Sequence, residues 1–118
     1  MRDRVAEMQA DLCKTLGSPT RIAILKSLED GEKTVGQLCR QLVLNQANVS
    51  QHLAVLRNRR MVVTRKSGKN VYYQVSNPKI VKACTLMREV LLEQFEETKR
   101  LTMVAVKARS VPRPTLTA

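Results

Sequence analysis

The chain has no tryptophan, one histidine, two tyrosines and one phenylalanine. Proteins that bind single-stranded nucleic acid stack bases on aromatic side chains, so this scarcity argues against a single-stranded target. An enzyme is also disfavoured, because the histidine has no plausible acid–base partner near it and no glycine-rich phosphate loop is present. Zinc needs four ligands in a tetrahedral array, which one histidine and three widely spaced cysteines do not supply. We therefore predict neither a metal site nor a cofactor.

Long apolar runs are missing as well. No stretch approaches the length of a membrane span, and the N-terminus carries no apolar signal segment. Together with an odd number of cysteines, these absences favour a reduced, cytoplasmic location and no membrane association. The 118 residues leave room for one domain. We predict that this domain spans residues 1–107 and that residues 108–118, a basic segment with two prolines, are disordered.

Acidic side chains are absent between residues 34 and 76, where seven basic ones lie. Residues 1–33 carry six of each sign, and residues 77–118 carry eight basic and four acidic side chains, which together give the net charge of +11. A solvated surface is served by charges of either sign, so this one-sided segment indicates an anionic partner. Nucleic acid is favoured over a membrane surface because the basic residues flank a predicted helix with a polar face.

The acid-free segment has the pattern of a helix-turn-helix. Thr34 is a good N-cap and Gln37 completes a capping box, which predicts a helix that begins at residue 35. Apolar residues then recur at helical spacing as far as Leu42. The next three residues form a turn, and Asn45 at its end can cap a second helix over residues 46–58. In a helix-turn-helix the second helix enters the major groove of DNA.

The outer face of this second helix is polar, and its apolar stripe lies on the opposite side. Amide and hydroxyl side chains can read base edges in a major groove, although a merely solvated helix face is the alternative. His52 borders this face, where a bond to a phosphate and a structural bond to neighbouring backbone are both open. The predicted DNA contacts, including basic residues around the helix, are Gln46, Asn48, Ser50, Gln51, His52, Arg57, Arg59, Arg60, Arg65, Lys66 and Lys69.

Further helices and a hairpin are predicted on either side of the helix-turn-helix. Residues 2–16 form an amphipathic helix, and Ser18-Pro19 starts a second helix with Ile22, Leu25 and Leu28 on its apolar stripe and Ile24 alongside. Residues 62–66 and 71–75 are rich in Val, Thr and Tyr and are joined by a glycine turn, which predicts a β-hairpin with a basic tip. A long last helix follows. The fold class is therefore mainly α with a small β-hairpin, a winged helix-turn-helix of order α-α-α-α-β-β-α.

Three segments resemble the arsenic-repressor (ArsR/SmtB) family of winged helix-turn-helix regulators: LGSPTRIAILKSL, VSQHLAVLR and GKNVYYQVS. The similarity covers roughly residues 10–95. The resemblance implies a homodimer joined through the first and last helices. It also implies a repressor that sits on double-stranded DNA at an imperfect palindromic operator and leaves when a small inducer binds.

The sequence departs from this family in two respects. Arg59-Arg60-Met61 stand where many relatives have Ala-Gly-Leu, so an arginine is expected in a left-handed conformation that costs it about 1 kcal/mol more than glycine. The family's metal sites are also incomplete. Cys39 occupies the first position of one Cys-x-Cys pair but Gln41 the second, and the last helix lacks the Asp and His ligands of the other site.

The cysteines Cys13, Cys39 and Cys84 admit two interpretations. A free cysteine often packs as a small hydrophobe, and Cys39 and Cys84 adjoin apolar stripes as core residues would. Alternatively, Cys13 and Cys84 lie on the helices that the resemblance assigns to the dimer. A thiol-reactive inducer such as an oxidant, a polysulfide or arsenite could then act on dimer geometry, although a disulfide needs Cα atoms within about 7 Å.

Taken together, these patterns predict a sequence-specific, homodimeric DNA-binding repressor of transcription. The alternative is a winged-helix module for protein–protein interaction without inducer sensing. Such a module would have an apolar or acidic recognition face, and the face predicted for this chain is polar and flanked by basic residues.

Overall fold

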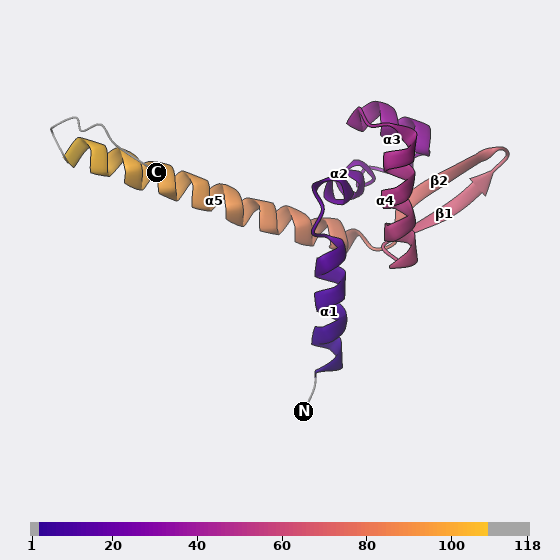
Figure 1. Cartoon of the computed structure of the whole chain (residues 1–118), viewed down its shortest axis with the longest axis horizontal. Coiled ribbons are helices and arrows are strands. Elements are labelled where there is room, and N and C mark those ends of the chain that lie inside the picture. The colour runs from indigo at the N-terminus through magenta and orange to yellow at the C-terminus, as the bar shows by residue number, and fades with distance from the viewer. Residues whose placement is uncertain (1–2, 109–118) are drawn as a thin grey trace. The chain divides into compact units, whose positions relative to one another are not determined.

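The computed structural model describes residues 3–108, which contain five helices and one two-stranded sheet (Figure 1). Residues 3–84 form one compact unit, and the remaining described residues belong to a second. The order of elements confirms the predicted winged helix-turn-helix. The elements are α1 (Arg4–Thr15), α2 (Pro19–Ser27), α3 (Val35–Leu42), α4 (Gln46–Asn58), β1 (Val62–Ser67), β2 (Asn70–Val75) and α5 (Pro78–Ala108). Apart from Ala108, the predicted tail lies outside the described residues.

Local capping explains where α3 and α4 begin. The Thr34 hydroxyl accepts a hydrogen bond from the Gln37 N–H at 3.2 Å, and the Gln37 side-chain oxygen accepts one from the Thr34 N–H at 2.8 Å. The predicted capping box is therefore confirmed. Asn45 caps α4 by accepting the Asn48 N–H at 2.8 Å, and α4 covers the residues predicted for it.

The core of the 3–84 unit is aliphatic and joins α2, α3, α4, β1 and the start of α5. In α2, the predicted stripe residues Leu25 and Leu28 are buried together with Ile24, whereas Ile22 is 40% exposed, so its predicted place on that stripe is wrong. The side of α2 that faces the core therefore carries residues 24, 25 and 28. The buried apolar residues are Ile24, Leu25, Leu28, Leu38, Val49, Leu53, Leu56, Met61, Val62 and Val81.

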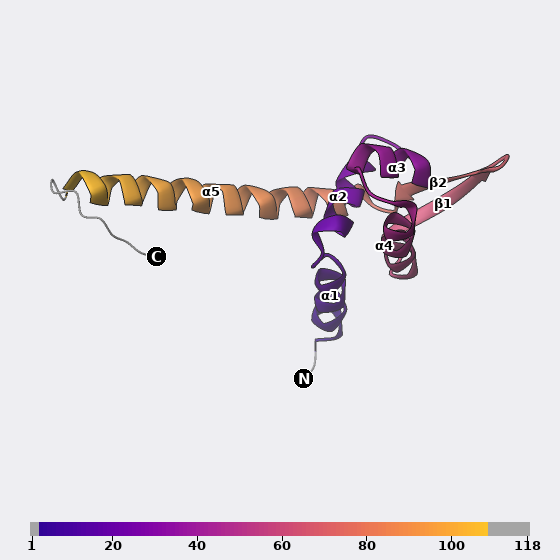
Figure 2. The same cartoon turned by 45° about the horizontal axis from the view of Figure 1, so that its top comes forward.

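The two strands pair antiparallel in a register that runs from Val62 opposite Val75 to Ser67 opposite Asn70. The hairpin extends away from α4, with its turn at the far end (Figure 2). A backbone bridge between Lys33 and Tyr73 fastens β2 to the loop that precedes α3: Lys33 N–H donates to Tyr73 at 3.0 Å, and Tyr73 N–H donates to Lys33 at 2.8 Å. The hairpin is thus attached to the helix-turn-helix through β2, in addition to the short segment of chain that joins α4 to β1.

Two helical segments expose apolar side chains. On α1, Val5 is 72% exposed and Met8 is 61% exposed. In the second unit, residues 85–108, Phe95 is 70% exposed and Leu101 is 53% exposed. Contiguous apolar surface of this kind on a helix typically marks a site where another molecule packs.

Candidate nucleic-acid interface

The recognition helix α4 buries one side and exposes the other. Leu53, at the centre of its apolar stripe, is fully buried in the core. The predicted contacts Gln46, Ser50 and Gln51 are exposed, as side chains that read base edges need to be. The N-cap of α4 engages none of these side chains, because Asn45 accepts a hydrogen bond from the backbone N–H of Asn48. The polar face is therefore free to bind a ligand.

Asn48 and His52 lie at the edge of this face and are half-buried. The Asn48 Oδ1 atom is buried without a hydrogen-bond partner among the described residues. His52 Nδ1 lies 3.4 Å from Nη1 of Arg21, a residue of α2 that the sequence patterns did not single out. Thirty-one positions separate Arg21 from His52, so no local spacing rule could have paired them. At this edge, the candidate interface therefore contacts α2 through Arg21.

A basic corner follows the recognition helix. The N–H of Arg60 donates to the carbonyl of Arg57 at 3.0 Å, and the N–H of Met61 donates to that of Leu56 at 2.8 Å, which together form a Schellman motif. Arg60 has φ of 61°, so the expected left-handed arginine is present. The Ser76 hydroxyl donates to the Arg60 carbonyl at 2.7 Å. Hydrogen bonds therefore hold the backbone of the corner, while the side chains of Arg57, Arg59 and Arg60 are exposed.

The hairpin presents its three cations differently. Arg65 donates two hydrogen bonds to the Glu32 carboxylate and stacks over Tyr72 at 4.9 Å from the ring centre. These hydrogen bonds lower the pKa of Glu32 and raise that of Arg65. Lys66 and Lys69 are exposed and form no ion pair with any residue in the 3–108 range. Lys66 and Lys69 are thus available to phosphates, whereas Arg65 already has a carboxylate partner.

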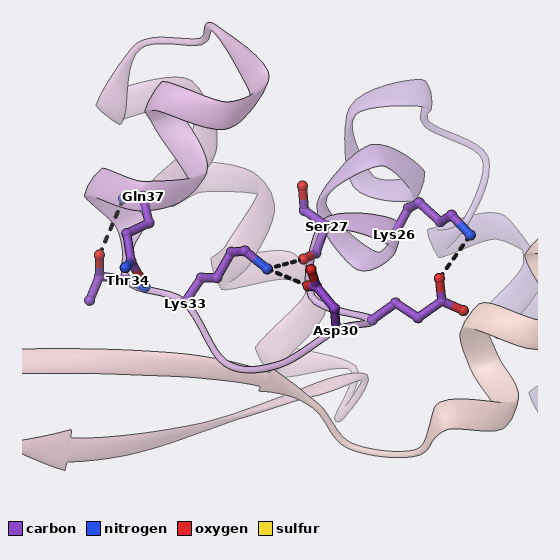
Figure 3. Close-up of polar contacts among 7 residues, drawn as sticks. Lys26, Ser27, Asp30, Lys33, Thr34 and Gln37 are labelled. Atoms are coloured by element: carbon purple, nitrogen blue, oxygen red, sulfur yellow. Dashed lines mark hydrogen bonds and ion pairs between the residues drawn. The ribbon is translucent and has the colours of Figure 1, made fainter.

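The loop that carries Glu32 is itself anchored (Figure 3). The Lys33 ammonium donates to the backbone carbonyl of Ser27 and to Asp30 Oδ1, the latter at 2.6 Å. The hydrogen bond and the charge of Lys33 lower the pKa of Asp30. With the backbone bridge from Lys33 to Tyr73, these contacts give Glu32 a fixed position beside β1. The sequence patterns did not indicate this loop, because the acid-free segment from which the DNA contacts were predicted begins after it, at residue 34.

The three candidate sensor cysteines are free thiols. Cys13 is exposed, Cys39 packs partly buried against the core, and Cys84 is partly buried. Burial raises the pKa of the Cys84 thiol, which lowers its thiolate fraction at neutral pH. Among the described residues, no cluster of three or more His, Cys, Asp or Glu side chains is arranged to hold a metal ion. No helix in the same part of the chain is both long and apolar enough to cross a membrane.

Known proteins are similar to this chain in both sequence and architecture. The family model for bacterial regulatory proteins of the arsR family matches residues 18–64. The biofilm growth-associated repressor of Xylella fastidiosa is 33% identical over 97 residues, which cover 82% of this chain and 84% of that protein. The crystal structure of Mycobacterium tuberculosis Rv0081 has a TM-score of 0.72 at 31% identity and covers 82% of this chain and 98% of its own. The homodimeric winged helix-turn-helix DNA-binding domain of Mb0332 from Mycobacterium bovis has a TM-score of 0.71 at 26% identity, and the match covers 82% of this chain and 93% of that one.

Proposed function

Because this chain belongs to the arsR family of bacterial regulatory proteins, we propose that it is a homodimeric repressor that binds an imperfect palindromic operator. The family consists of DNA-binding regulators of transcription rather than enzymes. The observation that carries the proposal is the surface formed by α4, the basic corner and the hairpin tip. This surface combines exposed amide and hydroxyl side chains with exposed cations. We place this activity in the cytoplasm, where both DNA and reduced thiols are found.

Two kinds of contact are proposed on this surface. Gln46, Ser50 and Gln51 read base edges in the major groove, with Asn48 at their edge. Arg57, Arg59, Arg60, Lys66 and Lys69 bind phosphates, and Arg65 joins them where it exchanges Glu32 for a phosphate. Because phosphate contacts release counterions, affinity should fall steeply as salt rises.

The proposed homodimer uses α1 and α5. The exposed apolar side chains of Val5 and Met8 on α1, and of Leu91 and Phe95 on α5, support this choice, because a second copy would remove them from water. The two recognition helices of the dimer would enter successive major grooves about 34 Å apart. Analytical ultracentrifugation of the full chain tests the assembly: a dimer supports the proposal, and a monomer at micromolar concentration contradicts it.

We further propose that a small inducer releases the dimer from DNA by favouring a form with unsuitable helix spacing. A thiol-reactive inducer would act first at Cys13, because its thiol is exposed. The raised pKa of Cys84 argues against that thiol as the first nucleophile. Cys39 packs against the core, which fits a structural role.

Fluorescence anisotropy with DNA from the chain's own promoter tests the proposal. The reduced protein should bind tightly and with a steep salt dependence. Treatment with a thiol oxidant or a polysulfide should weaken binding about tenfold or more, which corresponds to a coupling of about 1.4 kcal/mol, and Cys13→Ser should abolish this response. Binding that does not change would remove the cysteines from the mechanism. Absence of binding under every condition would contradict the repressor itself.

A further inference from the structure

Arg21 joins three helices of the 3–84 unit through one side chain. Its backbone N–H donates to the capping hydroxyl of Ser18 at 3.3 Å, which places it in the first turn of α2. Its Nε donates to the carbonyl of Thr15, the last residue of α1, at 2.6 Å. Its Nη1 lies 3.4 Å from Nδ1 of His52 in the recognition helix. The guanidinium is therefore anchored at the α1–α2 corner and directed at α4.

The chemistry of the guanidinium fixes the tautomer of the neutral imidazole. Arginine has five N–H donors and no acceptor, and it stays charged at all ordinary pH values. His52 Nδ1 can face it only as an acceptor, so the proton of the neutral ring must be on Nε2. Free neutral histidine exchanges between two tautomers, and Arg21 therefore selects the one whose N–H points away from it.

The selected N–H is available to a partner outside the chain. No residue in the described range accepts a hydrogen bond from His52 Nε2. Among the described residues, Asn48 Oδ1 is the one buried side-chain polar atom that lacks a hydrogen-bond partner. His52 Nε2 also lacks a partner but is not among the buried atoms, so it reaches solvent. His52 also directly follows the exposed Gln51 on α4. An exposed N–H at this border of the recognition helix is suited to a phosphate oxygen of a DNA strand.

We propose that Arg21 is a positioning residue for DNA binding, which holds the His52 ring as an Nε2–H donor to a DNA phosphate. This inference rests on the proposed DNA-binding function. Arg21 itself need not touch DNA, since its Nε and Nη1 are engaged by Thr15 and His52. Through the same bonds, the orientation of the His52 ring depends on the corner between α1 and α2. Helix α1 is one of the two helices proposed for the dimer.

The single histidine of the chain allows a direct test. Long-range ¹H–¹⁵N spectra of the full-length protein at about pH 8, above the ordinary imidazole range, report the tautomer of His52 alone. In the wild type, Nδ1 should be unprotonated and Nε2 protonated. In Arg21→Gln, the two nitrogens should move towards the averaged shifts of a free imidazole. A merely structural Arg21 would leave the tautomer as it is in a folded variant.

DNA binding supplies the second measurement. Arg21→Gln should weaken binding to promoter and unrelated DNA alike by about tenfold, because a phosphate bond carries no sequence information. His52→Phe should weaken it as much, and adding Arg21→Gln to His52→Phe should produce little further loss. His52→Gln, which restores an N–H donor near the same place, should recover part of the affinity.

Separate losses that add in the double variant would overturn the inference, as would an unchanged tautomer or unchanged affinity in Arg21→Gln. If Arg21→Gln does not fold, the comparison of His52→Gln with His52→Phe decides: equal affinity for these two variants contradicts the donor role. Failure of the proposed function is recognised separately, because then the wild type itself binds no DNA.

Discussion

Arg65 of β1 and Glu32 of the loop before α3 form an ion pair with two hydrogen bonds. The Nε–Oε2 distance is 3.1 Å and the Nη2–Oε1 distance is 2.5 Å. The two residues are 33 positions apart, and the guanidinium also lies over the Tyr72 ring. In the free protein, therefore, one of the three cations of the hairpin is held by a carboxylate, and a phosphate has to compete for it.

Removing the carboxylate should favour DNA. We expect Glu32→Gln to strengthen binding to DNA of any sequence by about two- to fivefold, because it frees Arg65 and removes a negative charge near the interface. The backbone bridge between Lys33 and Tyr73 remains, so the hairpin keeps its place. Anisotropy titrations at several salt concentrations measure both the affinity and its salt slope, and the slope should steepen.

Glu29→Gln is the matched control, since it removes an equal charge from an exposed ion pair with Lys26 on α2. It should change affinity less than Glu32→Gln. Weaker binding by Glu32→Gln would contradict the competition and would mean that the ion pair mainly orders the hairpin for DNA.

The two carboxylates of this loop also predict the response of stability to acid. The pKa of Glu32 lies below its ordinary value of 4.5, mainly because of the hydrogen bonds from Arg65, and Lys33 lowers that of Asp30 below 3.8. As pH falls, the carboxylates of the unfolded chain therefore take up protons before those of the folded chain do. The Glu32–Arg65 and Asp30–Lys33 pairs thus stabilise the fold above the ordinary carboxyl pKa range, and this stabilisation is lost as pH falls through the lowered pKa values. Thermal unfolding followed by circular dichroism between about pH 7 and pH 3 should show a decline that is shallower in Glu32→Gln/Asp30→Asn. An identical decline in the double variant would assign the acid sensitivity to other carboxylates.

Local signals were sufficient to predict the helix-turn-helix. Thr34, Gln37 and Asn45 act within four residues of their own positions, and the recognition helix begins and ends where its cap and apolar stripe predict. The pairs Glu32–Arg65 and Arg21–His52 could not be predicted in this way. Each joins elements that come together only when the core has packed, and spacing in the sequence says nothing about such contacts.

Val43 provides a test of backbone strain in the turn between α3 and α4. It has φ of 56° and is 86% exposed, so a β-branched side chain occupies the left-handed region and packs against little. Val43→Gly should raise the free energy of unfolding by about 0.5–1 kcal/mol, the relief of strain less the added freedom of the unfolded chain. Urea unfolding measures this. Val63→Gly, in β1, is the control and should lower stability by a similar amount.

Lys66 and Lys69 should contribute to DNA affinity without contributing to specificity. Replacing both by Gln should weaken binding to operator and unrelated DNA alike, and should flatten the salt slope by roughly four for the dimer, one per lysine in each protomer. Lys26→Gln, which removes one charge from α2 away from the hairpin and from both proposed dimer helices, is the control for each lysine. A loss confined to operator DNA would show that the hairpin reads bases instead.

Arg60 is expected to lower the stability of the fold and to strengthen DNA binding. As the left-handed residue of the Schellman motif it is strained, and Arg60→Gly should raise the free energy of unfolding by about 1 kcal/mol. The same change should weaken DNA binding and flatten the salt slope by roughly two for the dimer, because one phosphate contact is lost in each protomer. Arg60→Lys separates the two effects, since lysine keeps both the strain and the charge: its stability should match the wild type and its affinity should be largely retained. Arg59→Gly should instead lower stability, because Arg59 has φ of −91° and gains nothing from glycine. A more stable Arg60→Gly protein with an unchanged salt slope would mean that the arginine at this corner does not contact the phosphate backbone, and its strained conformation would then need another explanation.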